Sequence, residues 1–278
     1  MKPGNNSIGV GTSKEFSLRI SVAAIVAVKF IDPENKKAVL ALERTATTQI
    51  KDEKPEVTVK AKPFGGGVRL LNPERLQDII GGFNYDSDRS SQEKDFRILT
   101  NPGSWNKIKE ICKEHLKQTE NGILDTGPER ELEEEFEDSL KIKIKPHDYS
   151  LQKKGILIED MPKNTGNINA RGLPTVRVYF LYDAQIKNVH IIDSILNSSR
   201  EYSDNDLAEM ALEDYSQGRK GRANAVLALD PDKLKDFYDS LPLIKRNGSF
   251  RFGEHQLDGN VIALFEDIRN HKYQRIPV

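Results

Sequence analysis

One acidic segment, Gly127–Leu140, constrains the fold of this chain more than any other stretch. Pro128 suits the first turn of a helix, because the N–H that proline lacks has no partner there in any case. Leu132, Phe136 and Leu140 are spaced i, i+4, i+8, so they form one apolar stripe along a helix. The segment is therefore predicted to be a helix whose apolar side packs against a core.

The same helix carries acidic residues on a different face. Glu131, Glu134 and Glu135 are spaced i, i+3, i+4, and like charges at this spacing repel by roughly 0.2–0.5 kcal/mol per pair. Arg130 relieves part of this repulsion. A divalent cation would relieve more, because hard cations such as Mg²⁺ take oxygen ligands. Taken alone, the pattern fits a metal site and a solvated, charge-rich helix equally well.

The order of residues in this helix resembles a known motif. Residues 130–135 (RELEEE) fit the pattern R-E-U-x-E-E, in which U is apolar and which forms the second half of the Nudix box. Upstream, Pro63–Val68 contains three consecutive glycines and resembles the glycine turn that opens this box. The chain is therefore similar to members of the Nudix superfamily.

Three features depart from the family box, G-x5-E-x7-R-E-U-x-E-E-x-G-U. The glycine turn lies far upstream of Arg130, so residues from about 69 to 125 are interpreted as an insertion inside the motif. No glutamate follows the glycines at the family spacing, although Glu74 is nearby. Glu137 stands where the family has a late glycine. The acidic half of the motif is thus a closer match than the glycine half.

The resemblance implies an α/β fold: a Nudix-like α/β/α sandwich with a mixed sheet, a helical insertion at about 69–125 and a C-terminal helical extension at about 242–278. Residues 1–15 are expected to be a flexible tail, which leaves residues 16–278 as one domain. The insertion connects the glycine turn to the acidic helix. It is therefore expected at the mouth of the site, as a lid or a wall of the substrate pocket.

The resemblance also implies hydrolysis of a phosphoanhydride bond in a nucleoside-diphosphate-linked substrate, with Mg²⁺ or Mn²⁺ as the cofactor. Such chemistry needs neutralised phosphate oxygens and an oriented water. By position, Glu134 and Glu135 would be metal ligands, and Glu131 a metal ligand or the general base. Arg130 would orient a glutamate, and Gly66 would offer its carbonyl oxygen to the metal.

Arg44 and Phe64 are the residues expected to bind the substrate. Arg44 ends a predicted hairpin, where the family often contacts its substrate, although a solvated charge at the end of a strand would give the same pattern. The family usually adds a further acidic ligand from later in the chain, and the sequence does not choose among five candidates. These are Glu201, Asp204, Asp206, Glu209 and Glu213.

Two other classes of protein fit the same residues. A Nudix-like sensor would bind a nucleotide and signal to a partner without turnover, and the altered box and the long insertion favour it. The retained acidic residues favour the hydrolase, because a pure binding module has no need for a crowded carboxylate face. An unrelated α/β domain with a chance acidic helix is the third reading.

The charge balance limits the partners of this chain. Its 278 residues carry a formal net charge of −1, which excludes a global electrostatic attraction to nucleic acid or to an anionic membrane. A local basic groove stays compatible with this balance. Arg219, Lys220 and Arg222 alternate with Gly218 and Gly221, and such a loop either holds a phosphate group or is a solvated turn.

The remaining composition points to a cytoplasmic protein. A single cysteine, Cys112, excludes an intrachain disulfide and suits a reducing compartment. No apolar run reaches the roughly 18 residues of a membrane span, and the N-terminus lacks a signal-peptide pattern. The resemblance implies a small nucleotide-type ligand, and the composition predicts no membrane partner and no strong nucleic-acid signal. The resemblance leaves a homodimer open, because many Nudix proteins dimerise.

Hydrophobic periodicity predicts strands interleaved with helices. Strands are expected at residues 16–30, 37–44, 56–61, 141–145, 155–159, 175–183, 189–192, 225–229 and 250–252. Besides the acidic segment, helices are expected at 72–80, 105–116, 201–215, 232–241 and 259–272. Residues 46–55 are expected to form a loop, and residues 86–94 a mobile polar segment.

Overall fold

A large mixed sheet forms the centre of the computed structural model, which describes residues 16–117, 122–165, 167–242, 248–265 and 273–278. Two long neighbouring strands, β1 (Leu18–Ile31) and β9 (Thr175–Ile186), run parallel through its middle, and most other neighbours pair antiparallel. Both strands are rich in Val, Ile, Leu and Ala and are almost completely buried. Such continuous apolar runs are typical of strands that are covered on both faces.

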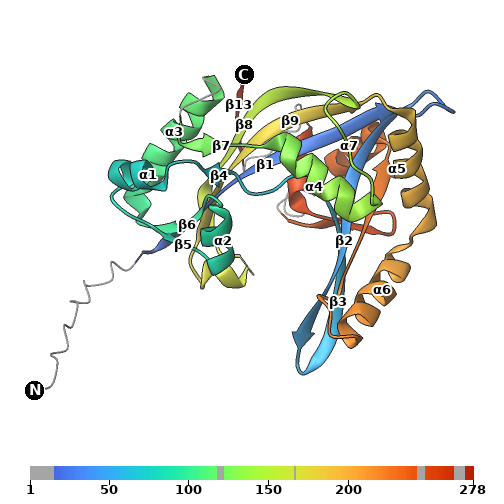
Figure 1. The fold of residues 1–278 in the computed structure, drawn as a ribbon, viewed down its shortest axis with the longest axis horizontal. Coiled ribbons are helices and arrows are strands. Elements are labelled where there is room, and N and C mark those ends of the chain that lie inside the picture. The colour runs from blue at the N-terminus through green and yellow to red at the C-terminus, as the bar shows by residue number, and fades with distance from the viewer. Residues whose placement is uncertain (1–15, 118–121, 166, 243–247, 266–272) are drawn as a thin grey trace, which may run out of the picture.

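The sheet runs in the order β11-β12-β3-β2-β1-β9-β8-β13, with β10 beside β2 and the β5–β6 pair beside the start of β1 (Figure 1). The other strands are β2 (Ala38–Lys51), β3 (Lys54–Lys62), β4 (Arg69–Leu70), β5 (Asn84–Tyr85), β6 (Arg97–Thr100), β7 (Leu124–Asp125), β8 (Tyr149–Lys163), β10 (Arg222–Leu229), β11 (Phe250–Phe252), β12 (His255–Leu257) and β13 (Gln274–Pro277). Strands β4 and β7 pair separately as a short ribbon.

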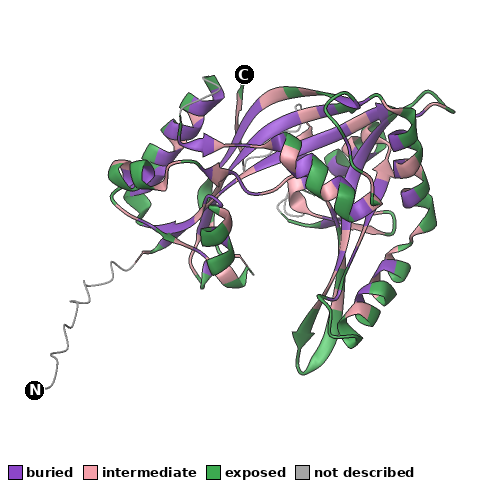
Figure 2. Cartoon of the chain, viewed as in Figure 1, coloured by how far each residue is buried: buried purple, intermediate pink, exposed green. Residues whose placement is uncertain are grey.

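Helices cover both faces of the sheet. They are α1 (Pro73–Ile80), α2 (Asp88–Glu93), α3 (Trp105–Lys117), α4 (Pro128–Leu140), α5 (Val189–Glu201), α6 (Asp204–Ser216) and α7 (Pro231–Ser240), with 3₁₀ helices at Pro102–Ser104, Ile168–Ala170 and Gly259–Leu264. On one face, α3, α4 and α5 pack on the even-numbered side chains of β1. On the other, α7, the last 3₁₀ helix and α6 pack on other parts of the sheet. The buried side chains lie between these layers (Figure 2).

Three different segments pair along one edge of β1. The first residues of β1 pair with β6, and its last residues pair with β2. Between them, Ala24 donates its N–H to the carbonyl oxygen of Gly66 at 2.9 Å, and Val26 donates to that of Phe64 at 2.8 Å. The glycine turn therefore fills the gap between β2 and β6 in the middle of the sheet.

The observed fold confirms the predicted class, a mixed α/β sandwich, and the helices α1, α3, α4, α6 and α7. Several local predictions are wrong. Residues 46–55 are not a loop, because β2 continues to Lys51 and returns as β3 through a tight turn in which Asp52 and Glu53 have positive φ. Residues 141–145 form no strand, and residues 189–192 begin α5, whose first turn the Asn188 side chain caps.

The polar segment at 86–94 is ordered rather than mobile. Asp86 is buried and forms an ion pair of 2.6 Å with Arg19 of β1. The hydroxyl of Ser90 donates to the same carboxylate at 2.7 Å, and the side chain of Ser87 caps α2. A polar sequence can thus be fixed by a buried, fully paired carboxylate, which composition alone does not reveal.

The two ends of the chain differ from the prediction or lie outside the described residues. The expected tail, residues 1–15, is not described. At the other end, the expected helix at 259–272 is a 3₁₀ helix that ends at Leu264, and residues 266–272 are not described. The C-terminal extension is therefore not mainly helical, because β11, β12 and β13 join the central sheet. None of the helices in the described ranges is both long and apolar enough to cross a membrane.

Candidate functional site

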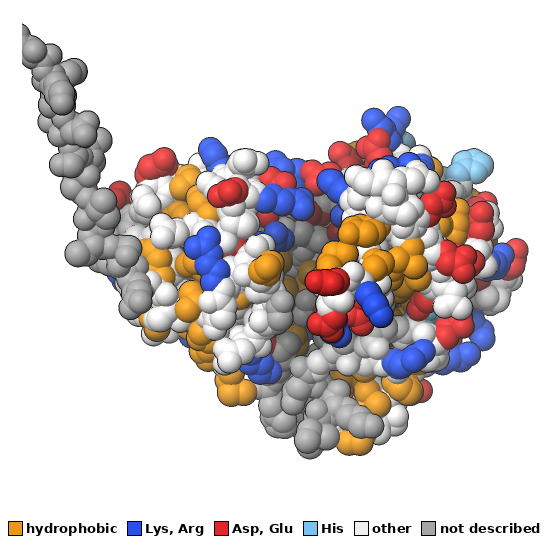
Figure 3. Space-filling view, turned by 90° about the horizontal axis from the view of Figure 1, so that it is seen from below, with side chains coloured by type: hydrophobic (Ala, Val, Ile, Leu, Met, Phe, Trp, Pro, Cys, Tyr) orange, Lys and Arg blue, Asp and Glu red, His pale blue; other side chains and the backbone are white. Residues whose placement is uncertain are grey.

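A cavity of about 360 Å³, the charged cavity, lies where the glycine turn meets α4. It is lined by Lys62, Gly65, Gly66, Gly67, Arg69, Arg89, Glu93, Asp95, Arg97, Arg130, Glu131, Glu134, Glu135, Asp138 and Arg222. Every lining residue except the three glycines is charged. From below the view of Figure 1, the molecule is hollowed between the half that carries α1–α3 and the half that carries α4–α6, with basic and acidic side chains beside the hollow (Figure 3).

The glycine turn lies in direct contact with the carboxylates of α4. The N–H of Gly65 donates to Oε2 of Glu135 at 2.6 Å. A Cβ atom at Gly66 would lie 1.8 Å from Oε2 of Glu131, which is far inside contact distance. The two segments that resemble the halves of one motif are thus adjacent, although some sixty residues separate them in the sequence. At Gly66 a residue without a side chain makes room for the carboxylate.

Glu131 is buried against the turn, with 7% of its surface exposed. Its Oε1 lies 2.5 Å from Nη1 of Arg130. Burial raises the pKa of the Glu131 carboxyl, and Arg130 opposes this effect while Glu134 and Asp95 add to it. The ionised form is therefore less well compensated here than in water, and an additional cation would stabilise it.

Glu135 belongs to a second cluster that includes Glu43 of β2. The Nζ of Lys62 lies 2.6 Å from Oε2 of Glu43 and 3.3 Å from Oε1 of Glu135, and Nη2 of Arg222 lies 3.3 Å from Oε1 of Glu43. Burial raises the pKa of Glu135 well above its ordinary value; Lys62 opposes this effect, and the negative charge of Glu43 adds to it. Burial also acts to raise the pKa of Glu43, but the nearby cations lower it overall. The pair therefore carries its negative charge mainly on Glu43.

Two arginines of the cavity keep unused hydrogen-bond donors. Nε and Nη2 of Arg130 and Nε of Arg69 are buried and have no hydrogen-bond partner within the described part of the chain. Glu134 does not use them, because its side chain is 60% exposed and approaches Arg130 only to 3.7 Å. Donors of this kind suit an anionic ligand, since guanidinium groups bind phosphate through several N–H groups at once.

Residues between the glycine turn and α4 supply one wall of the charged cavity. Arg69 comes from β4, Arg89 and Glu93 from α2, and Arg97 from β6. Asp95 precedes β6 and lies so close to the turn that a Cβ atom at Gly67 would be 2.5 Å from its Oδ1. Arg97 pairs with Asp95 at 3.1 Å, yet burial still raises the pKa of this carboxyl. No local pattern in the sequence distinguishes these residues.

Neither of the two residues predicted to bind the substrate lines the charged cavity. Arg44 is buried, and it donates to Oδ1 of Asp204 at 3.1 Å and to the carbonyl oxygen of Tyr202. Side chains alternate along a strand, so Glu43 faces α4 while Arg44 faces the opposite side of β2. Phe64 is also fully buried and stacks on Phe136 of α4, with ring centroids 5.1 Å apart.

The five later acidic residues proposed as further ligands do not line the charged cavity. Asp204 pairs with Arg44 and with Nδ1 of His255 at 3.2 Å, and Asp206 closes a capping box with Ser203 at the start of α6. The additional carboxylates at the cavity are instead Glu93, Asp95 and Asp138.

The predicted metal ligands are near one another but are engaged with protein groups. Glu131 is paired with Arg130, Glu135 with Lys62 and the N–H of Gly65, and one lone pair of the Gly66 carbonyl is taken by Ala24. Over the described ranges, no three His, Cys, Asp or Glu side chains converge as a ready metal site. The donors are all oxygens, which Mg²⁺ and Mn²⁺ prefer.

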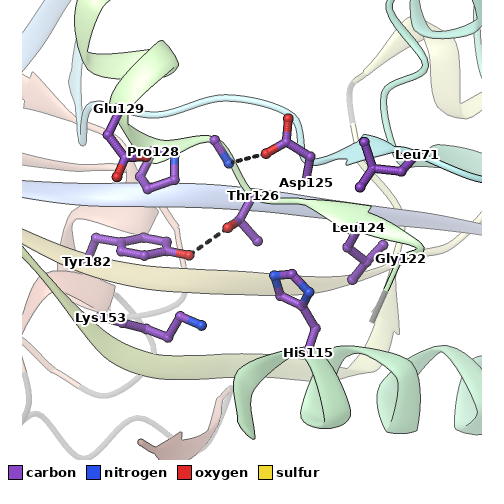
Figure 4. A pocket seen from close by; sticks show the side chains of 11 residues that line it. Leu71, His115, Gly122, Leu124, Asp125, Thr126, Pro128, Glu129, Lys153 and Tyr182 are labelled. Atoms are coloured by element: carbon purple, nitrogen blue, oxygen red, sulfur yellow. Dashed lines mark hydrogen bonds between the residues drawn. The ribbon is translucent and has the colours of Figure 1, made fainter. Parts of the chain in front are cut away.

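A second cavity, of about 450 Å³, lies behind the first turn of α4, between β7 and the strands β8 and β9 (Figure 4). The hydroxyls of Thr126 and Tyr182 are hydrogen-bonded at 2.7 Å, and burial raises the pKa of Tyr182 to about 12. Lys153 points toward the same space, and burial lowers its pKa. Its walls combine such polar groups with Leu71, Leu124 and Pro128, so it is less charged than the first cavity.

Comparison with known proteins gives no relative for this chain: no family model matches it, and neither do the curated proteins or the solved structures.

Proposed function

We propose that the charged cavity binds the phosphate groups of a nucleotide-derived ligand and hydrolyses a phosphoanhydride bond in it with the help of Mg²⁺ or Mn²⁺. The contact between the glycine turn and α4 is the observation that carries this proposal. It brings Gly65 and Gly66 against Glu135 and Glu131, as a single Nudix-like motif would require. The mixed α/β sandwich is compatible with the same class of hydrolase.

The donor set at the cavity fits the proposed cation. Glu131, Glu134 and Glu135 would hold it, and the raised pKa values of Glu131 and Glu135 mark positions where a cation would favour the ionised carboxylates. Loading requires Arg130 to release Glu131. When bound, Mg²⁺ or Mn²⁺ supplies charge neutralisation for the phosphate oxygens and lowers the pKa of a bound water.

The side chains of the cavity would have separate roles in the reaction. Arg130 and Arg69 would donate their unused N–H groups to phosphate oxygens, which orients the ligand and neutralises part of its charge. If Glu134 and Glu135 alone hold the cation, Glu131 would accept the proton of the attacking water, since burial raises its pKa. Positioning and electrostatic stabilisation supply most of the catalysis in such phosphoryl-transfer sites.

A turnover screen tests the proposal. The purified chain would be incubated with Mg²⁺ or Mn²⁺ and with nucleoside triphosphates, ADP-ribose, NAD and dinucleoside polyphosphates. Metal-dependent cleavage is expected, and Glu131→Gln should lower kcat by about a hundredfold or more, because a positioned acid–base group contributes roughly 10²–10⁴. Glu133→Gln is the matched control, because Glu133 lies on the same helix but outside the cavity. Equal kcat values for the two variants would reject the site.

The second candidate function is a nucleotide sensor without turnover. It is favoured by the pairing of Glu131 and Glu135 with protein cations, so that no metal site is ready-made in the described chain. A nucleotide that raises the melting temperature of the protein without being cleaved would support it. The cytoplasmic location and the homodimer stay predictions.

A further inference from the structure

We propose that a groove beside the charged cavity is a second phosphate subsite, and that the ligand is a short oligonucleotide rather than a mononucleotide. This inference rests on the proposed function, because it extends the same site. The groove has a volume of about 520 Å³ and lies between the end of α4, α6 and the start of β10. It shares Asp138 and Arg222 with the charged cavity, so one ligand can reach both.

Arg222 stands at the junction of the two spaces. Its Nη2 lies 3.3 Å from the buried Glu43 behind the charged cavity, while its Nε donates to Oδ1 of Asn224, a lining residue of the groove, at 3.1 Å. These two contacts fix the guanidinium between the cavity and the groove. A ligand that passes from one to the other must run along it.

The loop that leads into Arg222 is held in a defined shape. Gly218 and Arg219 donate their N–H groups to the carbonyl oxygens of Tyr215 and Asp214 at 3.0 and 2.9 Å. Gly221 has a φ of +58°, and a Cβ atom there would lie 2.9 Å from that of Tyr215. The backbone is thus packed against α6 and β2. The basic side chains of this loop are therefore presented from a fixed backbone, which lowers the entropic cost of binding.

The positive charge of the groove is only partly neutralised. Arg219 is paired with Asp214 at 2.5 Å. Lys220 has no acidic partner within the described ranges, and Lys141 donates to the main-chain oxygen of Asp138 at 2.9 Å, which leaves its charge in place. The charged cavity, by contrast, balances as many acidic as basic side chains. A phosphate group would therefore be attracted to the far end of the groove.

The groove combines basic and apolar side chains, and this combination indicates which kind of ligand it can bind. Met210, whose surface is 43% exposed, adds an apolar wall beside the basic residues. A phosphate next to an apolar surface matches a phosphodiester and its neighbouring base. A mononucleotide places all its phosphates together, so it would fill the charged cavity alone. A chain of two or more nucleotides has a further phosphate one nucleoside away, which the groove can take.

The test compares two probes on the same protein. One is a single-stranded tetranucleotide with a 5′-triphosphate and a 3′ fluorophore, and the other is the nucleoside triphosphate alone, used as a competitor. The intact chain should bind the tetranucleotide about tenfold more tightly than the nucleoside triphosphate, because added phosphate contacts contribute affinity. Lys220→Glu should abolish that preference, keep nucleoside triphosphate binding, and reduce the slope of log K against log salt by about one.

Lys187→Glu is the matched control, because it makes the same charge change at an exposed position that lines neither space. It should leave both affinities unchanged. Equal affinity of the intact chain for the two probes, or an unchanged preference in Lys220→Glu, would overturn the subsite. Tetranucleotide binding that Lys220→Glu weakens, without any cleavage, would keep the subsite and reject the hydrolase. Cleavage of mononucleotides, together with equal affinity for the tetranucleotide and the nucleoside triphosphate, would keep the hydrolase and reject the subsite.

Discussion

Strand β2 carries two ionic clusters on opposite faces, and they differ in how well their charges are compensated. On the α6 face, Asp204 is bound by Arg44 and His255, and although burial acts to raise its pKa, these two partners lower it overall. On the α4 face, burial raises the pKa of Glu135 well above its ordinary value, despite the nearby Lys62. In the first cluster the negative charge is compensated by its partners, whereas the second has an electrostatic deficit that a cation or ligand can relieve.

The two clusters are therefore expected to serve different purposes, one in stability and the other in ligand binding. A cluster whose negative charge is compensated holds elements together and gains little from a further cation. An under-compensated cluster at a cavity costs stability in the free protein and gains when a cation binds, which is common at functional sites. The comparison therefore predicts that changes on the α6 face act on folding, and changes on the α4 face act on ligand binding.

Within the two ionic clusters, the largest effect is expected from Arg44→Met. This change leaves the Asp204 carboxylate and the Tyr202 carbonyl without their buried donor, and breaking such a pair should lower the free energy of unfolding by about 3 kcal/mol. Urea denaturation would measure it. A loss below about 1 kcal/mol would show that the Arg44–Asp204 ion pair is as weak as a solvent-screened surface pair. The proposed difference between the two faces of β2 would then not hold.

The pH dependence of stability should have opposite signs on the two faces. Because folding raises the pKa of Glu135, its contribution to stability is present below the unfolded value near 4.5 and is lost as the pH rises through the native pKa. Glu135→Gln should therefore become more stable relative to the parent protein as the pH rises. Because folding lowers the pKa of Asp204, its contribution is present above 3.8 and is lost as the pH falls.

Asp204→Asn provides the matched measurement. Its deficit relative to the parent protein should be largest near neutral pH and should shrink as the pH falls below 3.8. Denaturation curves of the three proteins across the pH range would give both slopes. Parallel slopes for Glu135→Gln and Asp204→Asn would show that the two clusters are not electrostatically different.

Mg²⁺ should stabilise the protein through the α4 face alone. At a free concentration tenfold above its Kd, a cation that binds only the native state adds about 1.4 kcal/mol, or about 2–4 °C in Tm for a chain of this size. The shift should grow with pH, as Glu131 and Glu135 ionise, and should disappear in Glu131→Gln but persist in Asp204→Asn. A shift that Glu131→Gln retains would place the cation elsewhere.

The smallest effect on stability is expected from Gly66→Ala. The atoms nearest to the added Cβ atom belong to the end of the flexible Glu131 side chain, so the free energy of unfolding should fall by less than about 1 kcal/mol. Turnover should fall strongly, because Glu131 must leave its place. At Gly65, by contrast, a Cβ atom would lie 2.1 Å from the main-chain oxygen of Ala24 at a φ of +132°, and Gly65→Ala should unfold the protein. Similar thermal melts for both variants would contradict this assignment.

The sequence predicted local structure correctly where the information lies within a few residues. The acidic helix was identified because Leu132 and Phe136 repeat with the period of a helix, and both are fully buried in α4. The sequence did not show that Arg44 and Phe64 lie away from the charged cavity, because the side of a sheet on which a residue lies depends on pairing partners elsewhere in the chain. The prediction of a mobile segment at residues 86–94 was wrong, because Asp86 is held by an ion pair with Arg19, sixty-seven positions earlier.

The sequence by itself determined which segments have the period of a helix or a strand, and which short stretches carry crowded carboxylates or glycines. These properties follow from backbone geometry over a few residues. Only the tertiary structure decided that Gly66 lies against Glu131, that Glu43 and Lys62 surround Glu135, and that Asp95 joins them from the insertion. Burial and the distance between charges set the pKa of each carboxyl, and both quantities exist only once distant parts of the chain have been brought together.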